Sequence, residues 1–281
     1  APADKEPRRH SYTRTVRVLL LNDYGTPTGG AELVVLGLRD EFRRRGHDAR
    51  LLASTAHPHG GTSVADYSCF GLAGKARGVT QVWNPSARRR LRTILREFDP
   101  DVVHVRLFLS QLSPAILPLL ADRPAIFHAA WYRSVCPLGT KLLPDGTICN
   151  DPAGVACLRH RCVPPYAAPT VLAQTTLWRR QRGVFDAVVA NSEATRRRLT
   201  EAGIAVTHTI WNGVADMGER APLDGRPTVI FAGRLVREKG VDVLVEAFRA
   251  VVDRVPSARL VVFGEGPERR LLEQRTAELA L

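Results

Sequence analysis

Two cations and a glycine follow one apolar segment at a spacing that suits phosphate binding. The candidate strand 228–231 is followed by Gly233, Arg234 and Lys239, and an apolar helical pattern begins at Val241. The N-terminus of a helix carries partial positive charge. An arginine can contact two phosphate oxygens at once, and a lysine adds a mobile point charge. The pattern predicts an anion site suited to a diphosphate, although two charges alone also describe a solvated basic turn.

The order of these residues resembles a known family. Gly-Arg-Leu at 233–235 and Lys-Gly at 239–240 precede a helix and a second candidate strand, 259–263, which ends in Gly-Glu-Gly-Pro at 264–267. This order resembles the donor-binding domain of retaining glycosyltransferases of family 4, which have the GT-B fold. The resemblance implies that a nucleotide-sugar diphosphate is held by Arg234 and Lys239. It also implies a set of donor-side glycines: Gly233, Gly264 and Gly266.

A pair of glycines opens the first candidate helix. The candidate strand 16–22 is followed by Thr-Gly-Gly-Ala-Glu at 28–32, where a helix begins that stops before Gly46. Glycines at a helix start let a ligand approach backbone N–H groups closely, although they also occur in plain tight turns. The spacing does not fit the dinucleotide fingerprint GxGxxG. The family resemblance implies that Gly29 and Gly30 line the cleft beside the donor phosphate and the acceptor.

Other candidate site residues stand at the ends of strands. His128 ends the candidate strand 125–127, and ligands gather at the carboxyl ends of parallel strands. The resemblance implies that His128 contacts the transferring sugar, although Ala129 replaces the Asp that often follows in the family, and a satisfied core histidine is the alternative. His104 is expected to have no chemical role. Asn212 and Gly213 resemble the Pro-Asn-Gly-Val turn of the family and are expected to form a hinge that contacts the donor.

The segment 131–165 interrupts the alternation of strands and helices and holds four of the five cysteines. Clustered cysteines in a reducing compartment favour metal thiolates over disulfides, and a metal could hold together a loop with no core of its own. The spacing lacks a tight CxxC pair, so structural zinc, an iron–sulfur centre, two disulfides and unrelated thiols all stay open. The predicted ligands of the structural metal are Cys136, Cys149, Cys157 and Cys162.

Strands alternate with helices along the whole chain, and near-continuous Val, Leu and Ile runs indicate strands buried on both faces. The pattern predicts an α/β protein with two Rossmann-like domains, as in the GT-B fold. We expect an acceptor-side domain over 14–215, with the cysteine-rich insert at 131–165. Residues 216–281 are expected to form the first part of a nucleotide-sugar-binding domain. The second domain is expected to be incomplete within this chain, because two strand–helix units are fewer than such a domain needs.

Composition predicts a soluble, cytoplasmic protein, since no apolar run is long enough to span a membrane and the N-terminus lacks a signal-peptide core. The net charge of +12 comes largely from clustered arginines. The segment 83–98 reads as an amphipathic helix with an apolar side formed by Leu91, Ile94, Leu95 and Phe98. A solvated basic face is the first interpretation of such clusters. A peripheral contact with an anionic membrane surface is the second, and nucleic acid is disfavoured because no binding module is visible.

The resemblance implies transfer of a sugar from a nucleotide diphosphate donor to an unknown acceptor, which could be lipid-linked, a glycan or a small molecule. It implies retention of anomeric configuration and no catalytic metal or other cofactor. The 281-residue chain alone is expected to be inactive, because the later acidic motif of the family has no counterpart before its end. A non-catalytic binding module that uses the cysteine-rich insert and the basic surface is the alternative. A pyridoxal-phosphate-dependent phosphorylase is disfavoured, because its lysine motif is not visible.

Overall fold

The computed structural model describes residues 14–57, 60–74, 77–214, 218–219 and 225–281. The chain divides into two compact units, and each is described by itself. The first unit comprises residues 1–141 and 150–213, and the second comprises 142–149 and 214–281. The sequence-based division at 215/216 is two residues from the end of the first unit, while the short segment 142–149 of the insert groups with the second. The acceptor-side and donor-side roles of the two parts stay predictions.

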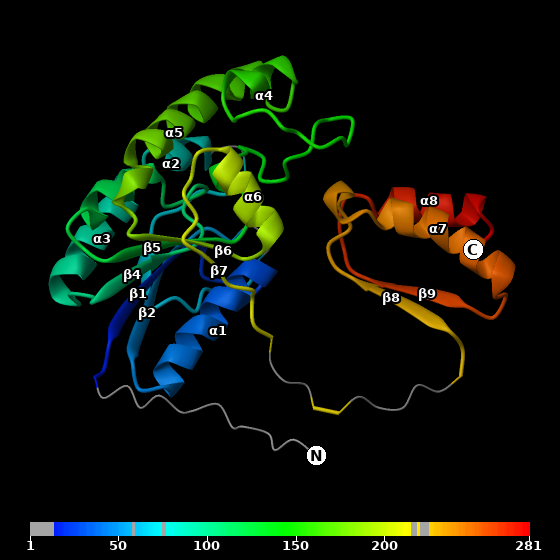
Figure 1. Ribbon diagram of the computed structural model, residues 1–281, viewed down its shortest axis with the longest axis horizontal. Coiled ribbons are helices and arrows are strands. Elements are labelled where there is room, and N and C mark those ends of the chain that lie inside the picture. The colour runs from blue at the N-terminus through cyan, green and yellow to red at the C-terminus, as the bar shows by residue number, and fades with distance from the viewer. Residues whose placement is uncertain (1–13, 58–59, 75–76, 215–217, 220–224) are drawn as a thin grey trace. The chain divides into compact units, whose positions relative to one another are not determined.

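The first unit is built on one parallel sheet (Figure 1). Its described strands run in the order β3-β2-β1-β4-β5-β6-β7, and every pairing is parallel. Because parallel neighbours need crossover connections, the helices lie between the strands in the chain. The strands are β1 (Arg17–Tyr24), β2 (Asp48–Ser54), β3 (Tyr67–Cys69), β4 (Val102–Val105), β5 (Ala125–Ala129), β6 (Ala187–Ala190) and β7 (His208–Thr209).

Alternate side chains of β1 enter two separate cores. Val18 and Leu20 pack with Val35 and Leu36 of α1 (Gly30–Arg44) on one face of the sheet. Leu19 and Leu21 belong to the larger core on the other face. That core also receives side chains from α3 (Pro85–Glu97), the 3₁₀ segment η2 (Pro114–Leu120), α5 (Ala168–Gln181) and α6 (Glu193–Glu201). Burial on both faces explains the near-continuous apolar runs of the strands.

The amphipathic pattern at 83–98 forms α3, and its apolar side faces the larger core. Leu91, Ile94, Leu95 and Phe98 are all at most 6% exposed. Asn84 caps the helix, since its side chain accepts a hydrogen bond from the N–H of Ala87 at 3.0 Å. The apolar surface needed to rest on lipid is therefore used inside the protein. No helix in the described part of the chain is long and apolar enough to cross a bilayer.

The described parts of the first unit also contain several short helical elements, among them the 3₁₀ segment η5 (Arg182–Val184). The helix α2 (Arg77–Val82) packs against α5. The helix α4 (Val155–Arg159) and the 3₁₀ segments η3 (Tyr132–Ser134) and η4 (Pro165–Ala167) lie in the insert. Polar contacts hold parts of the insert: the Lys141 amine donates to the carbonyl of Asp151 at 2.8 Å, and the Arg179 guanidinium donates to the carbonyl of Ala153 at 2.8 Å.

The described part of the second unit contains a two-stranded parallel sheet, β8 (Thr228–Ala232) and β9 (Arg259–Phe263). The helices α7 (Val241–Arg254) and α8 (Arg269–Glu278) lie on the same side of it (Figure 1). A small core joins them, formed by Leu235, Val241, Val245 and Leu272. The other face is open in this structure, where Ile230 is 64% exposed and Phe263 is 59% exposed.

Candidate functional site

In the first unit, buried polar groups gather where β1, β4 and β5 end. Asp23, near the end of β1, is 1% exposed, and its carboxylate accepts hydrogen bonds from the N–H groups of Ser110, Gln111 and Leu112 at 2.7–3.0 Å. Burial raises the pKa of Asp23, and the three donors oppose that rise. Asp23 thus ties the loop after β4 to the end of β1, because both of its carboxylate oxygens bond to the backbone of that loop.

Arg106, directly after β4, contacts the predicted site histidine. Arg106 is 2% exposed, and its Nη1 lies 3.0 Å from Nδ1 of His128. His104 of β4 stacks on His128 of β5, with ring centroids 5.4 Å apart and its Nε2 3.3 Å from the same Nδ1. The strand register places these rings together, because His104 pairs with Ile126, two residues from His128. We call these three residues the Arg106 cluster.

The Arg106 cluster is poorly satisfied by hydrogen bonds. Nε and Nη2 of Arg106 and Nε2 of His128 are buried and have no hydrogen-bond partner in the described residues. Burial, with help from the Arg106 charge, lowers the pKa of His128 to about 3 and that of His104 to about 4. Burial lowers the pKa of Arg106 to about 10, against an opposing effect of Glu32. Both imidazoles are therefore neutral at pH 7, and the guanidinium is charged.

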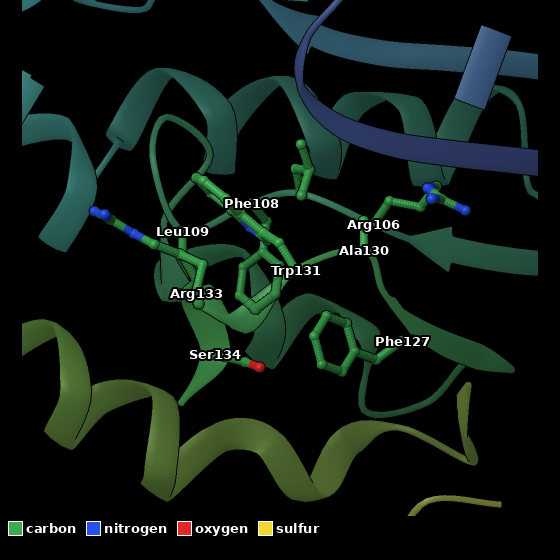
Figure 2. Close-up of a pocket in the computed structure, with 9 residues that line it drawn as sticks. Arg106, Phe108, Leu109, Phe127, Ala130, Trp131, Arg133 and Ser134 are labelled. Atoms are coloured by element: carbon green, nitrogen blue, oxygen red, sulfur yellow. The ribbon is translucent and has the colours of Figure 1, made fainter. Parts of the chain in front are cut away.

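A small cavity lies beside Arg106 (Figure 2). The Arg106 and Arg133 side chains extend to opposite sides of it, and Phe127 and Trp131 contribute aromatic walls. Its volume of about 10 Å³ holds about one water molecule. The cavity is too small for a sugar, so any substrate must bind outside it.

The glycine pair stands at the start of α1 as predicted. Gly29 is the N-cap and has no side chain to satisfy the first N–H groups. A Cβ on Gly29 would lie 2.3 Å from Oε2 of Glu32, so that carboxylate folds over the helix start, whereas a Cβ on Gly30 would meet nothing within 4 Å. The Glu32 charge offsets part of the positive end of α1. Gly30 is therefore the more open of the two candidates.

In the second unit, the predicted cations follow β8 and precede α7. Arg234 is loosely paired with Glu238, at 3.6 Å, and its side chain is 62% exposed. Lys239 is exposed and ends the 3₁₀ segment η6 (Arg237–Lys239). Gly240 adopts φ 63° and caps α7 without a side-chain hydrogen bond, so backbone N–H groups at this helix start lack an internal acceptor. The arrangement can hold an anion.

Packing between two loops requires glycine at two of the predicted donor-side positions of the second unit. Gly264 has φ 157°, and a Cβ there would come within 1.8 Å of the Gly233 carbonyl oxygen. A Cβ on Gly266 would lie 2.2 Å from the carbonyl oxygen of Leu235. Hydrogen bonds from the N–H of Gly233 to Phe263 and from Leu235 to Glu265, both 2.9 Å, hold the two loops together. These glycines let the loop that carries Arg234 run directly alongside the loop after β9.

A cavity of about 470 Å³ opens beside these loops. Its lining includes Leu235, Val241 at the start of α7, Gly264 and Leu272, with Glu265 and Glu273 among the polar groups. Its size is in the usual range for small-molecule sites. The predicted hinge residues Asn212 and Gly213 are exposed and lie in an irregular segment after β7, and their contact with the donor stays a prediction.

The structure does not support the predicted metal centre. No group of three or more His, Cys, Asp or Glu side chains is positioned for a metal ion within the described ranges, which include Cys136, Cys149, Cys157 and Cys162. Cys136 is buried and the other three are partly exposed. Backbone hydrogen bonds also occur in the insert, for example from the N–H of Cys162 to the carbonyl of Cys157 at 2.9 Å. A zinc or iron–sulfur site at these four cysteines therefore has no support from the described residues.

Sequence reasoning missed Asp23 and Arg106 and dismissed His104. The available signal was position, since Asp23 and Arg106 stand at the carboxyl ends of neighbouring strands, where polar residues interrupt apolar runs. Their contacts join residues more than 20 positions apart, and only the strand order brings those residues together.

Comparison with known proteins gives a consistent result. Residues 28–216 match the family model of Glycosyltransferase Family 4, and residues 216–281 match that of Glycosyl transferases group 1. A GDP-mannose-dependent alpha-mannosyltransferase of Mycobacterium tuberculosis is 27% identical, covering 92% of this chain and 65% of its own length. A phosphatidyl-myo-inositol mannosyltransferase of the same species is 27% identical, and the matched region covers 88% of this chain and 59% of that protein. The chain thus spans less than two thirds of these curated relatives.

Solved structures show the same fold. The sucrose-phosphate synthase of Thermosynechococcus elongatus has a TM-score of 0.59 at 15% identity, covering 94% of this chain and 68% of its own. The catalytic domain of starch synthase IV from Arabidopsis thaliana has a TM-score of 0.55 at 13% identity, and the matched region covers 94% of this chain and 71% of that one. These similarities confirm the predicted GT-B α/β fold. Because the family 4 model matches well over half of the chain, this protein belongs to glycosyltransferase family 4.

Proposed function

We propose that this protein transfers a sugar from a nucleotide diphosphate donor to an acceptor with retention of anomeric configuration. The observation that carries the proposal is its membership of family 4 over residues 28–216. One relative is named as GDP-mannose-dependent and another as acting on phosphatidyl-myo-inositol. GDP-mannose is therefore the first donor to test. Lipid-linked, glycan and small-molecule acceptors are all candidates.

The second unit is the proposed donor side. Arg234 and Lys239 are exposed, and Arg234 has one long ion pair that a ligand can displace. The uncapped start of α7 adds backbone N–H donors to these two cations. The cavity of about 470 Å³ touches Val241 and Gly264, so a nucleoside placed there would have its diphosphate near the same helix start. The proposed binding group is thus a diphosphate with an attached nucleoside.

The proposed chemistry places most of the work on the departing diphosphate. Its developing negative charge is stabilised by Arg234, Lys239 and the amides of the α7 start, which are present before the reaction. On the acceptor side, Asp23 is buried and bonded to three backbone N–H groups, so it is not free to act as a nucleophile. We propose that the leaving phosphate deprotonates the acceptor on the face from which it departs, with His128 beside the transferring sugar and Gly29 and Gly30 facing the ligands.

Nucleoside diphosphate binding tests the donor site without an acceptor. The affinity of the protein for GDP is measured by calorimetry for the wild type and for the Arg234→Ala and Lys239→Ala variants. Each loss of a charge-assisted hydrogen bond is worth about 1.5–3 kcal/mol, which weakens binding about 10-fold to 100-fold. Arg259→Ala is the matched control, because Arg259 stands at the opposite end of the same sheet and bonds Thr228 there.

Equal GDP affinity in the wild type and both variants would refute the assignment of these two cations. If GDP does not bind at all, UDP and ADP are tested in the same way before the donor class itself is rejected. Retention is tested separately, on the product of transfer from GDP-mannose, by the anomeric coupling in its NMR spectrum. A product of inverted configuration would contradict the proposed stereochemistry and leave the transfer activity standing.

A further inference from the structure

The hydrogen bonds of the Arg106 cluster restrict where the proton of His128 can be. A neutral imidazole carries one proton, on either Nδ1 or Nε2, and the other nitrogen is then an acceptor. Arginine can only donate. Because Nη1 of Arg106 lies 3.0 Å from Nδ1 of His128, Nδ1 must be the acceptor. The proton of His128 is then on Nε2.

Without Arg106 this choice would be open. Nε2 of His104 lies 3.3 Å from the same Nδ1, and two neutral imidazoles can share such a contact in either direction. His104 can donate to His128, or His128 can donate to His104. An arginine donor on Nδ1 is compatible with the first arrangement alone. Arg106 therefore orders the protons of both rings.

The surroundings keep the pair neutral. His128 is 8% exposed, and the charged group in contact with it is the Arg106 guanidinium. Burial disfavours the charged form of either ring, and the neighbouring guanidinium charge disfavours it further, so the pKa of both histidines lies well below the usual value. Glu32 is the acidic group whose charge acts on Arg106 from α1.

We propose that Arg106 is a positioning residue that holds His128 as the Nε2–H tautomer, so that His128 is a fixed hydrogen-bond donor and not a base. Arg106 reaches this role from the loop directly after β4, while His128 belongs to β5, and the sheet register keeps the two residues together. Nε2 is buried and has no hydrogen-bond partner among the described residues, so its proton is unsatisfied until an oxygen acceptor reaches it.

The ligand chemistry follows from the donors. Nε and Nη2 of Arg106 and Nε2–H of His128 are all donors, and all lack a partner among the described residues. The group they suit is an oxygen with lone pairs, such as a sugar hydroxyl or a phosphate oxygen. Within the proposed function, on which this step rests, His128 donates to the transferring sugar and takes no proton from the acceptor.

The tautomer itself is measurable in the free protein. The chain is labelled with ¹⁵N in its histidine rings, and long-range ¹H–¹⁵N correlation at pH 7 separates Nε2–H, Nδ1–H and doubly protonated rings. The His128→Gln and His104→Gln variants assign the two ring systems among the eight histidines of the chain. The expected wild-type result is the Nε2–H tautomer for both rings. This readout needs no substrate, so it is independent of whether the protein is a transferase.

Two substitutions at position 106 test the cause. Arg106→Met removes the donor with little change of shape, and His128 is then expected to populate both tautomers, with an Nδ1–H fraction of at least a tenth. Arg106→Lys keeps a charged donor and is expected to restore the single Nε2–H tautomer. The spectra of the remaining histidines, among them His47 and His208, report whether each variant has kept its fold.

The proposal is overturned by wild-type His128 in the Nδ1–H or doubly protonated form at pH 7, a result that needs no variant. It is also overturned if a folded Arg106→Met protein keeps His128 wholly as Nε2–H. If Arg106→Met does not fold, the wild-type and Arg106→Lys spectra still decide, since loss of the single tautomer in either contradicts the proposal.

Discussion

His128 and Arg106 in the first unit are 8% and 2% exposed and are held by contacts between neighbouring strands. Arg234 in the second unit has a 62% exposed side chain and one ion pair of 3.6 Å, and Lys239 is exposed. The first site is set before any ligand arrives. The second consists of exposed cations on a turn that backbone hydrogen bonds hold against the loop after β9.

The difference suits the two kinds of ligand that the proposed reaction needs. A neutral donor of fixed direction discriminates by geometry, because a misplaced hydroxyl cannot bond to it. Exposed cations on flexible stems adapt to a diphosphate, and their charge attracts it over a distance. We therefore expect substitutions of the buried polar residues of the first unit to change stability strongly, and substitutions of the exposed cations of the second unit to change ligand binding and leave stability almost unchanged.

The largest effect is expected for Asp23→Ala. The change leaves the buried N–H groups of Ser110, Gln111 and Leu112 without their acceptor. Each unsatisfied buried donor costs about 1–3 kcal/mol, so the free energy of unfolding of the first unit should fall by at least about 3 kcal/mol in urea denaturation. Asp122→Ala, at an exposed position, is the control and should change it by less than about 0.5 kcal/mol. A similar small effect for Asp23→Ala would contradict the role assigned to it.

The next effect concerns pH and separates the two units. In the unfolded chain a histidine has a pKa of about 6.5, whereas in the fold the pKa of His128 is lowered to about 3 and that of His104 to about 4. Between these values the unfolded state binds more protons, so stability is lost as pH falls below about 6.5. At pH 5 the loss approaches about 2 kcal/mol per histidine relative to pH 8.

This loss should belong to the first unit, because residues 214–281 contain no histidine. Hydrogen exchange at pH 5 and pH 8, corrected for the intrinsic rate, reports the opening free energy of each unit separately. The double variant His104→Gln and His128→Gln should flatten the pH dependence of the first unit. A pH dependence of equal size in both units would show that the histidine pair is not its source.

A third effect tests the glycines of the second unit. A Cβ at Gly264 would overlap the carbonyl of Gly233, and its φ of 157° is also unfavourable for other residues. Gly264→Ala should lower the stability of the second unit by about 2 kcal/mol, within the range for forced overpacking. Ser257→Ala is the control, because Ser257 is exposed in a turn of the same unit. Equal stability of the two variants would favour a ligand-contact role for Gly264 over the structural one.

Much of the fold could be predicted because it depends on local patterns. The buried runs at Val18–Leu21, the amphipathic helix at Pro85–Glu97 and the Gly-Arg-Leu turn at 233–235 each show their structure within a few residues. The candidate cations and the glycine pair were found for the same reason. Their chemistry is visible in a short stretch next to a strand end.

The remaining features depend on strand order, which a single sequence does not display. The contacts between Arg106 and His128 and between Asp23 and the loop 110–112 need β1, β4 and β5 to be neighbours. The predicted cysteine ligands lack support for a related reason. The clustering of four cysteines in one insert suggested metal ligands, but clustering in the sequence does not show whether side chains converge in space, and no metal-binding group is found among the described residues.

The smallest effect is expected for the exposed cations of the second unit. Arg234→Ala and Lys239→Ala should each change the free energy of unfolding by less than about 0.5 kcal/mol, because Arg234 loses only a weak surface ion pair and Lys239 is exposed. Thermal unfolding monitored by circular dichroism is sufficient. Destabilisation of more than about 1 kcal/mol would mean that these side chains support the turn, and the contrast with the first unit would weaken.

The central claim is that the second unit binds a nucleoside diphosphate at the start of α7. Titration of the ¹⁵N-labelled chain with GDP up to about 1 mM, a concentration that detects even weak binding, tests it most directly. The amide signals of residues 233–243 are predicted to shift with a common saturation curve, while those of Asp23 and of the loop 110–112 that bonds to it keep their chemical shifts. Shifts confined to the first unit, or none near α7 for GDP, UDP and ADP alike, would contradict the account.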